Sequence, residues 1–172
     1  DLGDGRGFLF AQMRDGAGRR IDLGTKGSGQ TPYSSFGDGR LTLKGAVREL
    51  LATEMLEALG VETSRTFSII ETGEALHRGD EPSPTRSAVL VRMSHGHIRI
   101  GTFQRLAAIH DAATMERLVR WCLTEFAGWE SAAAEALPAD EAAAVLLASV
   151  VNRTAATVAS YTIAGFVHGV LN

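Results

Sequence analysis

The sequence predicts an α+β protein made of two lobes. Strand-like segments separated by glycine-rich turns occupy the first hundred residues, with one amphipathic helix among them. Eleven of the nineteen glycines lie within the first 45 residues, which marks this part as rich in loops. After Phe103 the apolar spacing becomes helical. We therefore expect a mostly β lobe over residues 1–102 and a helical lobe over residues 103–172, with the boundary near residues 101–104.

Strands are predicted from β-rich runs bounded by turn residues. The segment "GFLFAQMR" at 7–14, the Asp-Gly turn "DGAG" at 15–18 and the segment "RRIDLGTK" at 19–26 together predict a hairpin. Residues 72–87 carry two glycines and two prolines, and we expect them to form an exposed connection. Three later runs also have strand composition: residues 65–71, 88–93 and "HIRIG" at 97–101.

Helices are predicted from apolar residues at three- and four-residue steps. The first runs from Leu43 to Leu59, and Gly60 stands where a left-handed cap belongs. An amphipathic helix is expected over 114–126, and Asp140 is expected to cap a long alanine-rich helix that reaches Ile163. The stripe expected to be buried on the first helix consists of Val47, Leu50, Leu51, Met55, Ala58 and Leu59.

The composition is that of an ordinary soluble protein. Seventeen basic and twenty acidic residues give a formal charge of −3, so no overall field favours nucleic acid or a membrane surface. No run of 18 apolar residues is present, so no membrane span is expected. The one cysteine, Cys122, excludes an intrachain disulfide and is expected to be a packed thiol. With no signal peptide visible, a cytoplasmic location is preferred, with a mitochondrial type as the eukaryotic alternative.

Lys26 stands at the start of a glycine-rich loop, residues 27–40, where backbone amides and a lysine can hold a phosphate. Alternatively, Lys26 is a solvated residue at a strand end. It precedes Gly27 and ends a strand, so it does not fit a Walker A motif. Protein kinases pair a strand lysine with a glutamate of the next helix. Glu49 borders the predicted stripe and is the candidate partner, unless it is an ordinary surface acid.

Three other patterns could bind anions or metals. "GDGR" occurs at 3–6 and at 37–40, as tight turns or as turns whose amides and arginines face an anion. Arg92 and Arg99 would face each other across a hairpin turning at 94–97, and two facing arginines suit phosphate oxygens. Without a hairpin, they would point to solvent. The "HGH" run within that turn lacks a third metal ligand, so turn residues are the favoured interpretation.

These pieces together resemble the selenoprotein O family of protein adenylyltransferases, which have a pseudokinase fold. The phrases that carry the resemblance stand in family order and cover most of the chain. They are "LGDGRG", "DLGTKGSGQTPYSSFGDGRLTLKGAVRELLATEMLEALGV", "AVLVRMSHGHIRIGTF" and "AGFVHGVLN".

The resemblance implies a protein-kinase-like α+β fold, with a mostly β N-lobe containing one central helix and the first helices of an incomplete α-helical C-lobe. It also implies transfer of AMP from ATP to hydroxyl side chains of protein substrates, with Mg²⁺ or Mn²⁺. Glu49 would orient Lys26. The residues that would bind ATP are Gly3, Gly5, Arg6, Lys26, Asp38, Gly39, Arg92 and Arg99.

The phrase "HGVLN" at 168–172 can be compared with a kinase catalytic loop. Val170 stands where the kinase base aspartate would be, and valine cannot accept a proton, which disfavours ordinary phosphoryl transfer. The family places its catalytic aspartate and its metal ligands after Asn172, so no catalytic or metal residue is expected within this chain. We therefore expect these 172 residues alone to be inactive. An atypical kinase and a non-catalytic nucleotide-binding module are the alternatives.

Overall fold

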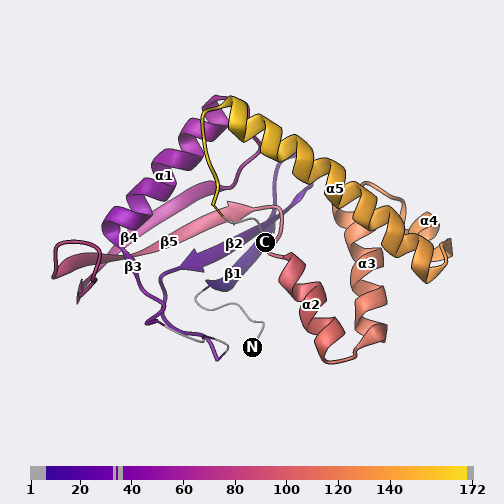
Figure 1. Ribbon diagram of the computed structural model, residues 1–172, viewed down its shortest axis with the longest axis horizontal. Helices are drawn as coiled ribbons and strands as arrows, with labels where there is room; N and C mark the ends of the chain where they lie inside the picture. Colours follow the sequence, from indigo (N-terminus) through magenta and orange to yellow (C-terminus); the bar gives the residue numbers. More distant parts are fainter. Residues whose placement is uncertain (1–6, 33, 35–36, 170–172) are drawn as a thin grey trace. The chain divides into compact units, whose positions relative to one another are not determined.

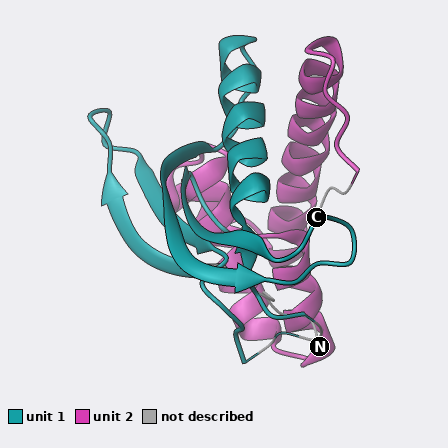
Figure 2. Cartoon of the chain, turned by 90° about the vertical axis from the view of Figure 1, so that its left-hand side faces the viewer, with its two compact units in different colours: residues 1–98 teal, residues 99–172 magenta. Residues whose placement is uncertain are grey.

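The computed structural model describes residues 7–32, 34 and 37–169, which form two compact units. Unit 1 comprises residues 1–98 and unit 2 comprises residues 99–172 (Figure 2). The lobe boundary expected from the sequence, at residues 101–104, lies within the first helix of unit 2, α2 (Ile100–Ala108). The architecture is α+β, as the sequence predicts.

Unit 1 is a five-stranded antiparallel sheet with one helix, and β5 is its central strand (Figure 1). One edge of β5 pairs with β2 through residues 90–94 and with β3 through residues 87–88, while β4 also pairs with β5. This sheet-plus-helix arrangement is compatible with a kinase-like N-lobe. Its elements are β1 (Gly7–Arg14), β2 (Arg20–Lys26), β3 (Leu41–Thr42), α1 (Leu43–Ala58), β4 (Arg65–Leu76) and β5 (Thr85–Ser94).

The hairpin β1–β2 forms as predicted because Asp15 shapes its turn. The Asp15 carboxylate accepts hydrogen bonds from the backbone amides of Ala17 and Arg19, each at 2.9 Å. The expected connection over 72–87 is wrong, because β4 continues to Leu76 and β5 already begins at Thr85. Gly73, with φ +77°, lies within a shift of the β4–β5 register, so the strands bulge there and then resume pairing.

Helix α1 begins and ends where the sequence indicates. The Thr42 hydroxyl accepts a hydrogen bond from the Gly45 amide at 3.1 Å, and Gly60 has φ +77° in the left-handed cap. The predicted buried stripe is wrong, because five of its six members are exposed: Val47, Leu51, Met55, Ala58 and Leu59. The packed face instead contains Ala46, Glu49 and Leu56, and it packs on β4 and β5.

The core of unit 1 lies between α1 and the sheet. Leu41, Ala46, Ala88 and Leu90 are buried there, and Leu43 and Ile69 pack against them. Leu90 belongs to the central strand and has no exposed surface. These contacts fix α1 against β5, which is the strand that carries Arg92.

Unit 2 is helical, and its central helix is α3. The predicted strand at 97–101 is wrong, because residues 95–99 are irregular and α2 begins at Ile100. Asp140 does not cap the long helix, since α5 begins at Ala139 and Asp140 lies within its first turn. Unit 2 comprises α2 (Ile100–Ala108), α3 (Ala112–Phe126), α4 (Ser131–Ala136) and α5 (Ala139–Ile163).

Helix α3 holds unit 2 together through packing and through one arginine. The Arg120 guanidinium donates to the carbonyl oxygens of Ala134 at 2.6 Å and Leu137 at 3.1 Å, which satisfies carbonyl groups at the end of α4. Leu123 is fully buried. Cys122 is buried as predicted, and burial raises the pKa of its thiol to about 11, which disfavours the nucleophilic thiolate.

Helix α5 is long and apolar enough to cross a membrane by length and composition alone. The expectation of no membrane span rested on the lack of 18 consecutive apolar residues, and polar residues such as Asn152 and Thr154 interrupt the apolar residues of this helix. The core helix of a soluble protein meets the same criterion, so this is weak evidence for a membrane span.

Replacing Leu90 by alanine should lower the free energy of unfolding by about 2–5 kcal/mol, because it leaves a cavity in the core beneath α1. Leu51→Ala is the matched control. Leu51 is 63% exposed, so its truncation should change stability by less than about 0.5 kcal/mol. Urea unfolding followed by circular dichroism measures both values. Equal losses for the two variants would contradict the orientation of α1.

Candidate functional site

Lys26 and Glu49 form the ion pair that the sequence predicts. Lys26 is the last residue of β2, and Glu49 lies on the packed face of α1. The Lys26 Nζ atom donates a hydrogen bond to Glu49 Oε1. The Lys26 and Glu49 side chains are 24% and 29% exposed, so the pair is partly withdrawn from water but still accessible to it.

Arg92, which lies on the neighbouring strand β5, also contacts the Glu49 carboxylate. Its Nη1 atom lies 3.6 Å from Glu49 Oε2, and its Nη2 atom donates a hydrogen bond to Ser64 Oγ at 2.8 Å. Glu49 therefore contacts two cations, one through each oxygen. Two positive charges and one negative charge leave this cluster with a net charge of +1. Such a cluster attracts an anion and offers it ammonium and guanidinium donors.

The register of the sheet brings these groups together. Residues 22, 24 and 26 alternate onto one face of β2. Gly24 lies directly opposite Arg92 on β5, so Arg92 shares the face of Lys26. Because α1 packs on β4 and β5, its inward-facing Glu49 reaches both strand cations.

A second polar group on this face was missed by the sequence analysis. Asp22 is 5% exposed, and its carboxylate accepts a hydrogen bond from Gln12 Nε2 at 2.7 Å. His97 Nδ1 lies 3.2 Å from the other oxygen of Asp22. A Cβ atom at Gly24 would lie 2.3 Å from His97 Nε2, so the imidazole occupies the space above that glycine. The signal in the sequence was that Asp22 precedes Lys26 by four positions on β2, which places both side chains on the same face of the strand.

The glycine-rich loop folds back on itself beside the end of β2. Gly27 has φ +96°, and a Cβ atom there would lie 2.6 Å from the carbonyl oxygen of Ala88. At Gly39, with φ +68°, a Cβ atom would lie 2.0 Å from the carbonyl oxygen of Gly29. The Gly29 amide donates to the Gly39 carbonyl at 3.3 Å. The Asp38–Gly39 turn is thereby held next to a residue that follows Lys26 closely in sequence.

The remaining predicted site residues are Gly3, Gly5, Arg6 and Arg99. Gly3, Gly5 and Arg6 lie outside the described residues. The predicted hairpin of Arg92 with Arg99 is wrong, because β5 pairs with β2, β3 and β4 instead. Arg99 belongs to unit 2, where it is the N-cap residue of α2.

The histidines of "HGH" contact the protein itself. His97 bonds with Asp22, and His95 Nδ1 lies 3.4 Å from the carbonyl oxygen of Arg20. Over the part of the chain that the structure describes, no group of three or more His, Cys, Asp and Glu side chains is arranged to hold a metal ion.

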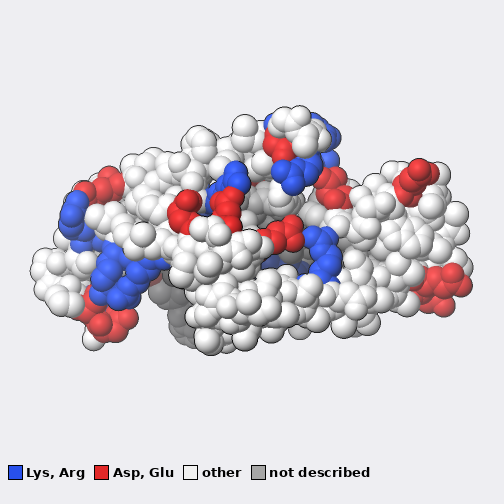
Figure 3. All heavy atoms as spheres, turned by 90° about the horizontal axis from the view of Figure 1, so that it is seen from above, with Lys and Arg blue, Asp and Glu red and all other residues white. Residues whose placement is uncertain are grey.

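Most of the charged groups around the sheet are paired. On the face that Figure 3 shows, basic side chains lie beside acidic ones instead of forming a broad basic patch.

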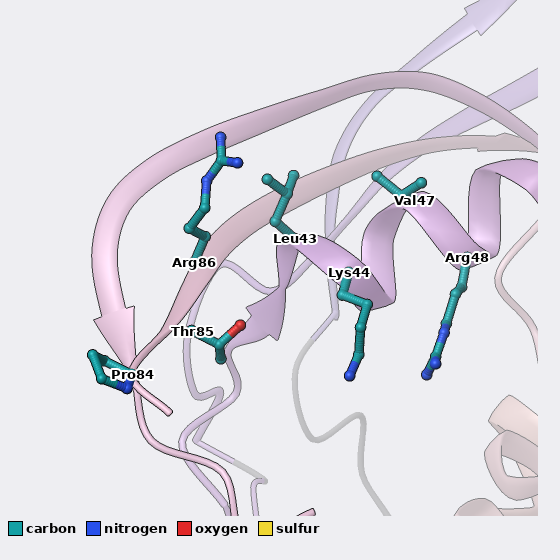
Figure 4. Close-up of a pocket in the computed structure, with 7 residues that line it drawn as sticks. All are labelled: Leu43, Lys44, Val47, Arg48, Pro84, Thr85 and Arg86. Carbon is teal, nitrogen blue, oxygen red and sulfur yellow. The ribbon is translucent and has the colours of Figure 1, made fainter. Parts of the chain in front are cut away.

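A hollow of about 480 Å³ lies along α1, with Leu43 and Val47 on one side and Lys44 and Arg48 on the other (Figure 4). Lys44 already pairs with Glu81 at 2.5 Å, and among the predicted site residues that the structure describes, none lines this hollow.

Replacing Glu49 by glutamine should lower the free energy of unfolding by about 1–2 kcal/mol, since two partly buried cations would lose their shared counter-charge. Glu54→Gln is the control, because Glu54 lies on the exposed side of the same helix. Urea unfolding at neutral pH provides the comparison. Equal midpoints for the two variants would show that the carboxylate does not hold the cluster together.

The chain is similar throughout its length to proteins of one family. Residues 1–172 match the family described as protein adenylyltransferase SelO. The protein nucleotidyltransferase YdiU of Gloeobacter violaceus is 53% identical over 171 residues, covering 99% of this chain and 34% of that relative. The protein of the same name from Synechocystis sp. is 51% identical over 173 residues, covering 100% of this chain and 35% of the relative.

A more distant relative shows the same coverage. The protein nucleotidyltransferase YdiU of Marinomonas sp. is 39% identical over 171 residues, which are 99% of this chain and 34% of that relative. The chain thus spans about a third of the length of the curated relatives it matches. Because the family match extends over residues 1–172, the chain belongs to the protein adenylyltransferase SelO family.

Proposed function

We propose that this chain supplies the nucleotide-binding part of an enzyme that transfers AMP from ATP to hydroxyl side chains of proteins. The observation that carries the proposal is the Glu49 carboxylate shared by Lys26 and Arg92, which leaves a cluster of net charge +1 beside a glycine-rich loop. The relatives bear the name protein nucleotidyltransferase, and the family is described as protein adenylyltransferase. Both descriptions support ATP as the substrate.

In this proposal Lys26 and Arg92 bind phosphate oxygens of ATP. Lys26 provides a compact charge that Glu49 orients, and Arg92 provides a planar guanidinium that can bind two oxygens at once. The further nucleotide contacts that we propose are those expected from the sequence: Gly3, Gly5, Arg6, Asp38, Gly39 and Arg99. We also propose a pseudokinase fold, with residues 1–102 as its N-lobe and residues 103–172 as the start of its C-lobe.

The proposed transfer forms one bond and breaks one bond at the α-phosphorus of ATP. The hydroxyl oxygen of the protein substrate bonds to the α-phosphorus, the bond to the oxygen bridging the α- and β-phosphorus atoms breaks, and pyrophosphate leaves. The hydroxyl proton passes to a base that we place, with the metal ligands, after Asn172. A bound Mg²⁺ or Mn²⁺ would neutralise phosphate charge. Lys26 and Arg92 hold the phosphates so that the α-phosphorus stays in place.

A kinase reaction is the second candidate, because a strand lysine paired with a helix glutamate is also the arrangement that protein kinases use. Val170 weighs against it, since that side chain cannot accept the proton of a hydroxyl. The two reactions differ in the group they leave on the substrate, which is AMP in the first and phosphate in the second.

We also propose a cytoplasmic location for the protein, and fractionation of the source cells tests it.

Intact mass of an acceptor protein after incubation with ATP and metal tests the proposed reaction. The coding sequence that contains these residues should be expressed to its stop codon, next to the 172-residue chain alone. The acceptor should gain one AMP unit, and Lys26→Ala should slow this gain by roughly 100-fold. Lys44→Ala is the control, since Lys44 pairs with Glu81 and stands apart from the cluster. A gain of phosphate would replace the proposal with the kinase reaction.

A further inference from the structure

The connection between β4 and β5, residues 77–84, contacts the Asp38–Gly39 turn. Arg78 donates from Nη1 to Asp38 Oδ2 at 2.9 Å and from Nη2 to Asp38 Oδ1 at 3.0 Å. Such a two-pronged contact fixes the plane of a carboxylate as well as its position. The Arg78 side chain is 25% exposed, so it is partly withdrawn from water.

The backbone of Arg78 is itself held in place. The Ser83 hydroxyl accepts a hydrogen bond from the Arg78 amide at 2.8 Å and donates one to the Arg78 carbonyl at 3.0 Å. A second ion pair joins the glycine-rich loop to β4, with Arg40 Nη2 lying 3.1 Å from Glu74 Oε1. The glycine-rich loop is therefore tied to the β4–β5 hairpin on both sides of Gly39.

The Asp38 carboxylate also shapes its own turn, because it accepts a hydrogen bond from the Arg40 amide at 2.9 Å. The hydrogen bonds from the Arg78 side chain and, to a smaller extent, from the Arg40 amide hold the pKa of Asp38 below its usual range. The carboxyl group is therefore ionised at neutral pH. An ionised carboxylate repels phosphate unless a cation neutralises it. Arg78 thus supplies both the position and the counter-charge of this group.

We propose that Arg78 is a positioning residue for nucleotide binding, which acts by holding the Asp38–Gly39 turn against Gly29, near the start of the glycine-rich loop. This inference rests on the proposed function, in which that turn contacts ATP. Arg78 itself need not touch the nucleotide. Its effect should therefore pass through Asp38 and should appear as weaker binding of ATP.

The β4–β5 hairpin also offers a matched control. Arg86 forms a two-pronged pair with Glu71, with both hydrogen bonds at 2.5 Å, within the paired strands. This ion pair joins β4 to β5 and does not involve the loop at residues 27–40. Arg86→Ala therefore removes the same kind of pair from the same hairpin and leaves Asp38 in place.

Calorimetric titration with ATP of the full-length protein, without turnover, tests this inference. Arg78→Ala should raise the Kd for ATP about fivefold, the effect of one exposed ion pair, while Arg86→Ala should leave it unchanged. Arg78→Lys should restore part of the affinity. In an Asp38→Ala background, Arg78→Ala should cause no further loss, because the carboxylate through which Arg78 acts would be absent.

Amide hydrogen exchange provides a readout without nucleotide. Arg78→Ala should speed exchange at Gly29, whose amide bonds to Gly39, and Arg86→Ala should not. An unchanged Kd in Arg78→Ala, with Lys26→Ala still impaired, would overturn the inference and leave the proposed function standing. If the unsubstituted protein does not bind ATP, the proposed function fails and this inference fails with it.

Discussion

The Glu49 carboxylate, held between Lys26 and Arg92, is the contact on which the arrangement of unit 1 depends. A partly buried carboxylate is costly unless cations face it. Helix α1 can turn Glu49 toward the sheet because β2 and β5 present a cation each on that face. The same rotation leaves Val47 and Leu51 exposed, so the helix gives up apolar burial on one side to keep its glutamate paired.

A residue without a side chain lies next to this cluster on β2. Gly24 stands opposite Arg92, and the space that a side chain would fill holds the His97 ring. Asp22 anchors that ring from the same face of β2. A side chain at position 24 would displace the imidazole, so the glycine, the histidine and the buried aspartate form one packing unit next to the cation cluster.

Local patterns in the sequence were sufficient for the hairpin β1–β2, the ends of α1 and the Lys26–Glu49 pair. Each depends on a few neighbouring residues or on one strand followed by one helix. The orientation of α1 was not predictable from apolar spacing, because the packed face contains Glu49, which that spacing left at the border of the predicted stripe. The run at 97–101 has the composition of a strand, yet residues 97–99 are irregular and α2 begins at Ile100.

The two cations of the cluster are held differently, and this difference bears on how an anion would bind. Lys26 is hydrogen-bonded to Glu49, whereas Arg92 lies 3.6 Å from the same carboxylate, beyond ordinary hydrogen-bond length. Its hydrogen bond with the Ser64 hydroxyl is a neutral-acceptor bond, weaker than one to a charged oxygen. Arg92 could therefore exchange its contacts for a phosphate at a small cost in free energy. Lys26 would meanwhile keep its hydrogen bond to Glu49 and stay in position.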